Sequence, residues 1–368
     1  MSKATKAHEP LVHITKRAAM PFWQSMLIRF GAVAVAFIAC ALVIVLITDL
    51  NPIEVYAAMF KGAFGSTRKI WITAQNTAVL LCISLAVTPA FKMRFWNIGA
   101  EGQVLIGCLA TCACLILLDD VLPTPILFLV MIVGSILAGA IWAVIPAVFK
   151  AKWNTNETLF TLMMNYVAIQ VVSFFITKWE NPKGSATIGI INPSTNAGWL
   201  PQLFGNKYLL NILIVLALTL ILYVYLKYSK HGYEIAVVGQ SENTARYVGM
   251  NVKKVIIRTM AISGAICGIA GFIIVSGIDH TMSTESAGGQ GFTAIMVSWL
   301  AKFNPLIMIL TSFLIVFFDR GAGQIAQNFR LNESISDILT GIILFFIIGS
   351  EFFVNYKINF RSSKKEVK

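Results

Sequence analysis

Polar side chains that could hydrogen-bond a solute occur at two places where a long apolar run begins. One is Asn97-Ile98-Gly99-Ala100-Glu101-Gly102-Gln103, and the other runs from Glu157 to Asn165. At about 100° per residue, a helix would place Asn97 and Glu101 on one face. Such groups are costly in an apolar environment unless they meet a polar partner or cavity. We therefore predict that six side chains line a polar path: Asn97, Glu101, Gln103, Glu157, Thr161 and Asn165.

Each of these segments also has a structural interpretation, which the sequence leaves open. Glu101 could lie near a membrane interface and stabilise the N-terminus of its own helix. Asn154 could cap the second helix with Glu157 as its partner, a variant of the capping box. Asn165 could hydrogen-bond another helix, since an amide two turns into an apolar run needs a partner. The glycines of the first segment indicate close helix packing or partial unwinding.

No group of residues indicates catalytic, metal or redox chemistry. The four histidines are scattered, and the six cysteines lie in apolar runs, typical of buried small hydrophobic residues. Ser286-Ala287-Gly288-Gly289-Gln290 resembles the Ser-Gly-Gly-Gln signature of ABC ATPases, but the sequence has no Gly-x-x-x-x-Gly-Lys phosphate loop. We predict a chain that is not an enzyme, hydrolyses no ATP, and holds neither a metal nor a cofactor.

The elements that carry the polar segments are predicted to be membrane-spanning helices. Of 368 residues, 57% are hydrophobic and 12% are charged, with a mean hydropathy of +0.76. A soluble domain would have about a quarter of its residues charged. In lipid, the backbone must satisfy its own polar groups, so apolar runs of about 20 residues become helices. The net charge of +12 is spread in short patches between these runs, which argues against nucleic-acid binding.

The apolar pattern predicts an all-α, polytopic transmembrane bundle with about ten segments. The eighth and ninth are short, and we expect them to be re-entrant segments or half-helices buried in protein. The segments are residues 28–47, 71–91, 97–118, 124–148, 157–178, 208–228, 255–277, 290–302, 304–318 and 334–352.

The distribution of basic residues predicts that both termini are cytoplasmic. With the N-terminus inside, the cytoplasmic segments hold 20 Lys and Arg and the outside segments hold eight. Cytoplasmic loops of membrane proteins carry such an excess. The first 20 residues are polar and basic and the apolar run after them is long, so we expect an uncleaved anchor.

The predicted organisation is one transmembrane domain, 28–352, between basic cytoplasmic tails at 1–27 and 353–368. It has outside loops at 49–70, with a short amphipathic helix, and at 179–207. A weak inverted repeat is possible, because Asn156-Glu157-Thr158 and Asn332-Glu333-Ser334 open segments from opposite sides, as do Gly102-Gln103 and Gly289-Gln290.

A third region of interest is the largest cytoplasmic loop between spans, residues 229–254. Ser241 is a suitable N-cap and Gly249 a suitable C-terminal glycine for a helix of about two turns. So short a helix is unstable alone in water and should be docked. It could be a mechanical coupling element or a packed surface loop, and these facts favour neither.

Three blocks resemble the permease subunits of ABC importers for simple sugars, branched-chain amino acids and nucleosides. They are Asn97–Gln103, Asn156–Asn165, and Gly239–Asn251 followed by the glycine-rich run Ser263–Gly271. The resemblance covers about residues 25–352. Ribose-type permeases carry Asp-Leu-Ser-x-Gly where this chain has Asn-Ile-Gly-Ala-Glu-Gly-Gln, which is typical of the purine-nucleoside branch.

The resemblance implies a multi-pass subunit in a bacterial cell membrane, surrounded by lipid and paired with a second permease, a non-identical paralogue. It implies a separate ABC ATPase subunit below and an extracytoplasmic substrate-binding lipoprotein above, facing 49–70 and 179–207. It also implies a coupling helix to the ATPase, carried by Gly239, Ser241, Glu242, Asn243, Ala245, Arg246 and Gly249.

The implied cargo is a purine or other nucleoside, with a simple sugar or a branched-chain amino acid as alternatives. An ion-coupled secondary transporter is an alternative of another class. The scarcity of acidic residues in mid-span argues against it.

Overall fold

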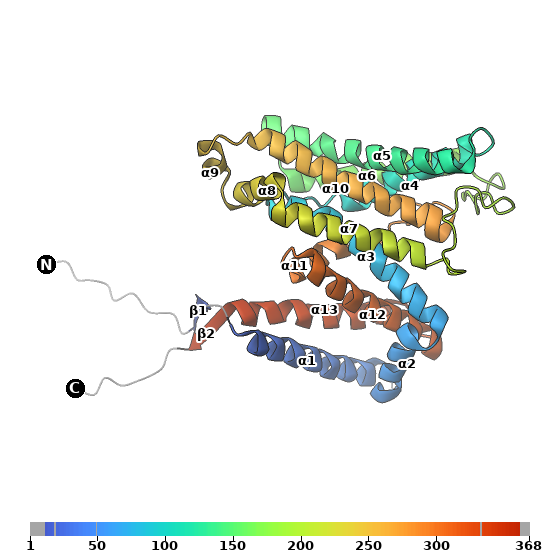
Figure 1. Cartoon of the computed structure of the whole chain (residues 1–368). Coiled ribbons are helices and arrows are strands. Elements are labelled where there is room, and N and C mark those ends of the chain that lie inside the picture. The colour runs from blue at the N-terminus through green and yellow to red at the C-terminus, as the bar shows by residue number, and fades with distance from the viewer. Residues whose placement is uncertain (1–11, 18–19, 49, 332, 361–368) are drawn as a thin grey trace, which may run out of the picture. The chain divides into compact units, whose positions relative to one another are not determined.

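The computed structural model describes residues 12–17, 20–48, 50–331 and 333–360, which are mainly helical (Figure 1). Within this part of the chain, nine helices are long and apolar enough to cross a membrane. The predicted all-α transmembrane bundle is therefore confirmed. The chain divides into two compact units, one of residues 1–63 with 318–368 and the other of residues 64–317.

The unit of residues 64–317 contains both predicted polar segments. Its helices are α3 (Thr67–Lys92), α4 (Ala100–Leu118), α5 (Thr124–Trp153), α6 (Glu157–Lys178), α7 (Leu209–Tyr228), α8 (Lys230–Gln240), α9 (Glu242–Tyr247), α10 (Val252–Ile274), a π-helical turn η1 (Val275–Asp279), α11 (Gln290–Leu300) and the first half of α12 (Pro305–Phe329).

Helix α10 is the centre of this unit, packed against α3, α4 and α5 (Figure 1). Glycines allow the closest approach, because a Cβ on Gly264 would lie 2.2 Å from the carbonyl oxygen of Gly139. Likewise, a Cβ on Gly102 would lie 2.9 Å from the side-chain oxygen of Asn165. Small residues at membrane helix contacts permit such packing. Both interpretations of the glycines in the first segment therefore apply, since Gly102 packs closely against α6 and Gly99 precedes the start of α4.

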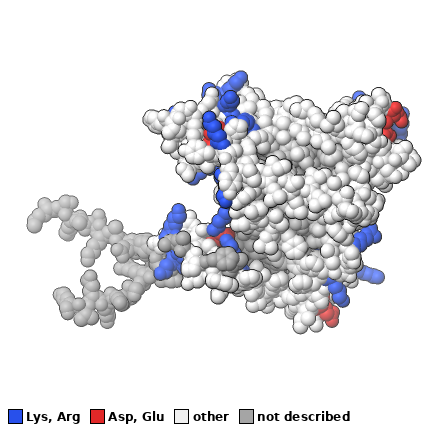
Figure 2. Space-filling model, in the orientation of Figure 1, with Lys and Arg blue, Asp and Glu red and all other residues white. Residues whose placement is uncertain are grey.

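Charged side chains on this unit gather at the ends of its helices. Lys and Arg lie around α8 and α9 and near the opposite ends, and the visible flank between them is uncharged (Figure 2). We call the end with residues 179–207 the outer end and the end with α8 and α9 the inner end, following the predicted orientation.

The other unit contains α1 (Phe22–Thr48), α2 (Pro52–Phe64), the rest of α12 and α13 (Glu333–Asn355). Helix α1 packs along α13, and Arg29 forms an ion pair with Glu351 at 2.5 Å. Strand β1 (Val12–Lys16) precedes α1 and pairs antiparallel with β2 (Tyr356–Phe360), which follows α13. This ribbon was not predicted, and it places the residues that flank α1 and α13 side by side at one end of the unit.

Two short predicted segments had different outcomes. The eighth is a half-helix as predicted, because α11 has 11 residues and is about 16 Å long. The ninth, 304–318, was predicted too short, because α12 has 25 residues. The apolar run ends before Arg320, but a Cβ on Gly62 of α2 would lie 2.8 Å from the carbonyl oxygen of Arg320. Close packing of α2 thus keeps this polar part helical.

The remaining predicted features of the loops can also be placed. The short helix expected in 49–70 is α2. Of the possible inverted repeat, Gly102-Gln103 and Gly289-Gln290 each lie at a helix start, while Asn332 lies outside the described residues. The repeat itself stays a prediction.

Candidate functional site

The chain between α3 and α4 is a non-helical break, and two side chains of α6 hold its backbone. The hydroxyl oxygen of Thr161 accepts a hydrogen bond from the amide of Ile98 at 3.2 Å. The side chain of Asn165 accepts from the amide of Gly102 and donates to the carbonyl of Ile98, both at 2.9 Å. Both side chains are buried. Asn165 therefore makes the interhelical hydrogen bonds that the sequence left as one of its two interpretations.

A buried cluster of amides ties the same break to α10. The side chains of Asn97 and Gln103 exchange hydrogen bonds at 3.3 and 3.1 Å, and Asn97 also donates to the hydroxyl of Ser263 at 3.1 Å. The prediction that Asn97 and Glu101 share a helix face is wrong, because α4 begins only at Ala100. Asn97 lies in the break, and its side chain bonds instead to Gln103 of α4 and Ser263 of α10.

Glu101 caps the N-terminus of α11 instead of that of its own helix. Its carboxylate accepts hydrogen bonds from the amides of Gly289 at 2.8 Å and Gly291 at 2.7 Å. A helix N-terminus carries partial positive charge, and charge-assisted hydrogen bonds are stronger than neutral ones. These two contacts offset the cost of burying a carboxylate that is only 8% exposed. A Cβ on Gly291 would lie 2.5 Å from the amide nitrogen of Glu101, so this close approach requires glycine.

The first turn of α11 has no amide left for another acceptor. Besides the two amides bound by Glu101, the amide of Gln290 donates to the carbonyl of Ala287. The amides of Phe292 and Thr293 donate to the carbonyl of Gly289. The positive end of this half-helix is thus fully satisfied within the chain.

Residues 281–300 connect the outer end of the unit to its inner end. At the outer end, the carbonyl of His280 accepts from the amide of Ile191, and its ring stacks on Trp199 with centroids 3.8 Å apart. At the inner end, the ring of Trp299 lies 6.3 Å from that of Phe91 in the last turn of α3. An irregular segment and the half-helix α11, which is the eighth predicted segment, together connect the two ends of the unit.

The N-terminus of α11 lies well inside the bundle, away from the start of α6. Asn165, which binds the amide beside Glu101, is eight residues from the start of α6. At 1.5 Å per residue it lies about 12 Å along that helix. The Glu101 carboxylate therefore lies about two helical turns into the bundle from the start of α6, and whether a membrane interface reaches it stays a prediction.

A hollow of about 430 Å³ lies at the outer end, beside the irregular segment. Hydroxyl groups dominate its polar lining, and they come from α6, the outer loop and the segment after η1. The lining residues are Ser173, Ile176, Thr177, Ala186, Thr187, Gly189, Ile190, Thr281, Met282, Ser283 and Thr284. Hydroxyls and backbone groups of this kind suit a neutral polar solute.

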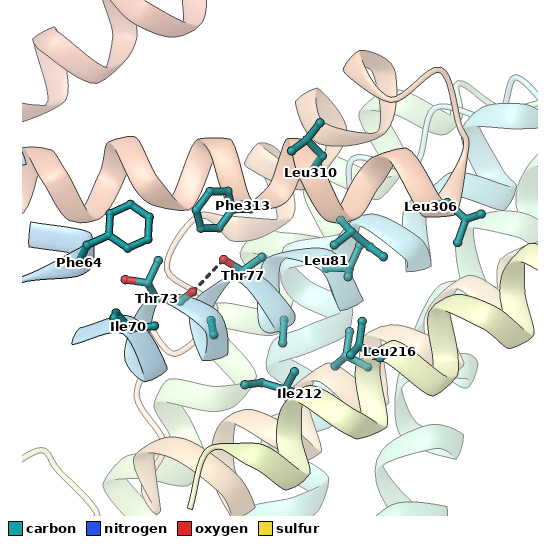
Figure 3. Close-up of a pocket in the computed structure, with 14 residues that line it drawn as sticks. Phe64, Ile70, Thr73, Thr77, Leu81, Ile212, Leu216, Leu306, Leu310 and Phe313 are labelled. Atoms are coloured by element: carbon teal, nitrogen blue, oxygen red, sulfur yellow. Dashed lines mark hydrogen bonds between the residues drawn. The ribbon is translucent and has the colours of Figure 1, made fainter. Parts of the chain in front are cut away.

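A second hollow, of about 470 Å³, lies between α3, α7 and α12 (Figure 3). Leu81, Leu216 and Phe313 line it with other apolar residues. The hydroxyl of Thr77 donates to the carbonyl of Thr73 at 2.8 Å, so it is already engaged within its own helix. This crevice suits apolar chains and offers little to a polar solute.

Glu157 lies apart from the buried cluster. Its carboxylate pairs with Lys150 at 2.9 Å, which joins the end of α5 to the start of α6. The predicted capping box is wrong, because Asn156 caps α6 by accepting from the amide of Leu159 at 3.1 Å. Asn154 instead ends α5 in the left-handed conformation.

Of the six predicted path residues, the structure brings five together: Asn97, Glu101, Gln103, Thr161 and Asn165 surround the break and the start of α11. Their polar groups bind this chain's own backbone and side chains. That they line a path stays a prediction. The sequence did not indicate the partner of Glu101, because Gly289 and Gly291 are almost 190 residues away.

The loop 229–254 contains the predicted short helix as α9. Ser241 caps it by accepting from the amide of Thr244, and Gly249 follows with a positive φ of 79°. Glu242 pairs with Arg246 at 3.3 Å and Asn243 is exposed, while Ala245 is buried. Both predicted caps are confirmed.

Three features of this loop were not predicted. Helix α8 precedes α9, and Gly239 at its end fits closely against α3, because a Cβ there would lie 2.1 Å from the carbonyl oxygen of Lys92. Tyr247 and Val248 at the end of α9 are 92% and 63% exposed. The signal in the sequence was a pair of large apolar side chains, Tyr247 and Val248, within an otherwise polar loop.

An ion pair fixes α8 to α10. The carboxylate of Glu234 accepts a hydrogen bond from Arg258 at 2.6 Å, and this bond lowers the pKa of Glu234 below its usual 4.5. A depressed carboxyl pKa stabilises the fold above the unfolded-state value of about 4.5 and loses that contribution as the pH falls through the folded-state value.

We therefore expect the thermal midpoint of the purified protein in detergent to fall between pH 5 and pH 3 more steeply than that of Glu234→Gln. The difference should be modest, about 1 kcal/mol, because the pair is partly solvated. A scan of the midpoint against pH for the two proteins measures it. Equal slopes would contradict a stabilising role for this pair.

Comparison with known proteins gives one family match. A family model described as the permease component of a branched-chain amino acid transport system matches residues 70–348. The matched region includes the break, α6, α9 and α11.

Three curated relatives are similar over most of the chain. The glucose ABC transporter permease protein TsgB13 of Haloferax volcanii is 25% identical over 94% of this chain and 93% of its own length. The guanosine ABC transporter permease protein NupP of Bacillus subtilis is 28% identical over 85% and 90%. The nucleoside ABC transporter permease protein NupB of Lactococcus lactis is 27% identical over 88% and 91%.

Proposed function

Because this chain belongs to the family of branched-chain amino acid transport system permease components, we propose that it is one membrane-spanning subunit of an ATP-driven importer. It forms part of the path of a small polar solute. The observation that carries this proposal is the crossing by residues 281–300, made of irregular backbone and a half-helix. Discontinuous segments at membrane depth border solute sites in transporters, where they line a cavity.

The most suitable solute is a nucleoside. Half-helix N-termini in transporters often point at an anionic group of the substrate, as an amino-acid carboxylate would require. Here Glu101 and nearby carbonyls occupy every amide of the first turn of α11. A neutral solute fits this arrangement better than an amino acid, and two of the relatives are named for guanosine and nucleosides.

A simple sugar is the second candidate. It is also neutral, it suits the hydroxyl-lined hollow at the outer end, and one relative is a glucose permease. A nucleoside carries a flat aromatic base, and a simple sugar does not. The two candidates can therefore be distinguished by testing whether the path accepts a flat aromatic group.

The proposed assembly has four kinds of subunit. A second permease, a non-identical paralogue, completes the path, and a substrate-binding lipoprotein delivers the solute to the outer loops. An ABC ATPase docks on the inner face at α9, whose exposed end supports such a contact. The chain itself performs no catalysis, and the complex works in a bacterial plasma membrane.

Uptake of radiolabelled solutes tests the function. Cells of the source organism that lack this chain should lose uptake of tritiated guanosine or adenosine and regain it with the wild-type chain. Loss of ribose or leucine uptake, with nucleoside uptake unchanged, would contradict the proposed substrate. Copurification with no ATPase would contradict the ATP-driven importer and favour an ion-coupled transporter.

A further inference from the structure

Exposed residues recur along residues 283–299, the segment that connects the outer end of the unit to its inner end, and we call them together its exposed face. On its irregular part Glu285 carries a carboxylate and Ser283 a hydroxyl. Two apolar rings follow on α11, the first of them 45% exposed. The exposed residues are Ser283, Glu285, Gly288, Gly289, Phe292 and Trp299.

Lipid is a poor environment for this face. Irregular backbone within the hydrocarbon region occurs only where protein buries it or where it borders a water-filled cavity. A carboxylate or hydroxyl on such a face adds a further cost in lipid. Ser283 also lines the hollow at the outer end, so the face continues from that hollow.

The inner half of the face carries aromatic rings at regular spacing. Phe292 and Trp299 are seven residues apart, so they lie on the same side of α11, about 10 Å apart along its axis. Trp299 stacks on Trp96, which lies in the break between α3 and α4, with ring centroids 5.8 Å apart and planes at 29°. Both tryptophan rings are about half exposed.

We propose that this face lines the translocation path, and that Phe292 stacks on the base of a passing nucleoside before the base reaches Trp299 and Trp96. Every nucleobase has a flat π-face, so stacking on an aromatic ring accepts different bases. The five buried polar residues lie behind this face and hold its shape. The inference rests on the proposed function for its substrate but not for the position of the path.

The rival interpretation of the tryptophan pair is an interfacial belt, in which Trp and Tyr mark the membrane boundary. It does not extend to Phe292. Phe292 lies about 10 Å from Trp299 along α11, beside Gly291, whose amide donates to the buried Glu101 carboxylate. Phe292 is therefore the residue that distinguishes a substrate-stacking face from a belt.

Labelling of introduced cysteines tests the position of the path. Ser283→Cys and Phe292→Cys should react with a negatively charged, membrane-impermeant methanethiosulfonate in the assembled transporter. Phe174→Cys is the matched control, because Phe174 is 64% exposed on the regular helix α6. It should react at least tenfold more slowly. Equal, slow reaction at Phe292 and Phe174 would overturn the path assignment.

Uptake by ring-conserving and ring-removing variants tests the stacking. Phe292→Leu should raise the KM for guanosine about tenfold while Phe292→Tyr stays within about twofold, because the energy of stacking on one ring corresponds to roughly that factor. Phe174→Leu should behave like the wild-type chain.

The two failures are distinguishable. If the wild-type chain restores no nucleoside uptake, the proposed substrate is rejected. The labelling experiment still tests whether residues 283–299 line the path, because it does not depend on the substrate. If the wild-type chain restores uptake but Phe292→Leu and Phe292→Tyr have the same KM, the stacking role is rejected. Protein levels measured in the membrane fraction identify a variant that fails to assemble. In that case, labelling of Ser283→Cys decides whether this segment lines the path.

Discussion

Replacing Glu101 by glutamine is expected to lower solute uptake to less than a tenth of wild type and to destabilise the purified protein. Glutamine keeps one acceptor oxygen, but its amide group would face a second backbone amide, so a donor would meet a donor. Leaving one buried donor unpaired costs about 1–3 kcal/mol. Glu101→Ala removes both acceptors and should cost more than Glu101→Gln.

The physical reason is the position of α11. Its N-terminus lies against the break between α3 and α4, and the buried Glu101 carboxylate binds two of its amides at 2.8 and 2.7 Å. Without the carboxylate, the half-helix loses both its cap and the charge that complements its dipole. Since α11 carries the exposed face of the crossing, uptake and stability should fall together.

Glu180 provides a matched control. Its carboxylate also accepts from two backbone amides, those of Gly184 at 2.8 Å and Ala186 at 3.3 Å, but it does so in the exposed outer loop. Water can replace these bonds, so Glu180→Gln should shift the thermal midpoint in detergent little. If Glu101→Gln changes substrate affinity without any loss of stability, Glu101 touches the solute and its capping role is secondary.

The sequence predicted elements better than the contacts between them. Apolar runs of adequate length identified the spans, because that pattern is local and lipid imposes it. Ser241 and Gly249 were recognisable for the same reason, since helix caps depend on a few adjacent residues. The true extent of α12 was missed because Gly62, far away in sequence, packs against it.

The sequence indicates which residues belong to the candidate site, but it does not indicate which groups they contact. Glu101 was expected either at an interface or in a path, and it caps a helix that follows it by almost 190 residues. Asn97 was assigned to a helix face although the backbone breaks there. The sequence does not distinguish Phe292 and Trp299, because aromatic residues in an apolar run resemble ordinary core residues. Their exposure emerges only from the packing of other helices.

The second large effect is expected at the exposed end of α9. Tyr247→Ala should reduce both the ATPase that copurifies with the permease and substrate-stimulated ATP hydrolysis by about tenfold or more. Aromatic residues at the centre of an interface commonly contribute about 2 kcal/mol or more to binding. Tyr247 is 92% exposed in this chain alone, and exposed Val248 lies beside it, so the change should leave the fold of the permease intact.

Different residues of the loop attach it to the bundle and remain available to a partner subunit. Buried Ala245 and the closely fitted Gly239 attach the loop to the bundle, whereas Tyr247 projects from it. Tyr233 on α8 is the matched control, since it is also exposed but belongs to the helix that packs against α3, α7 and α10. Figure 1 shows α9 farther out than α8 on this side of the unit.

Tyr233→Ala should therefore keep at least half of the coupled ATP hydrolysis. The thermal midpoint of each variant in detergent confirms that the permease itself is folded. If Tyr247→Ala and Tyr233→Ala retain the same amount of copurifying ATPase and the same rate of ATP hydrolysis, α9 is a packed surface loop. The ATPase subunit then docks elsewhere. If only Tyr247→Ala loses it, the two-turn helix capped by Ser241 transmits the motion of the ATPase to α10, because α9 joins that helix within five residues.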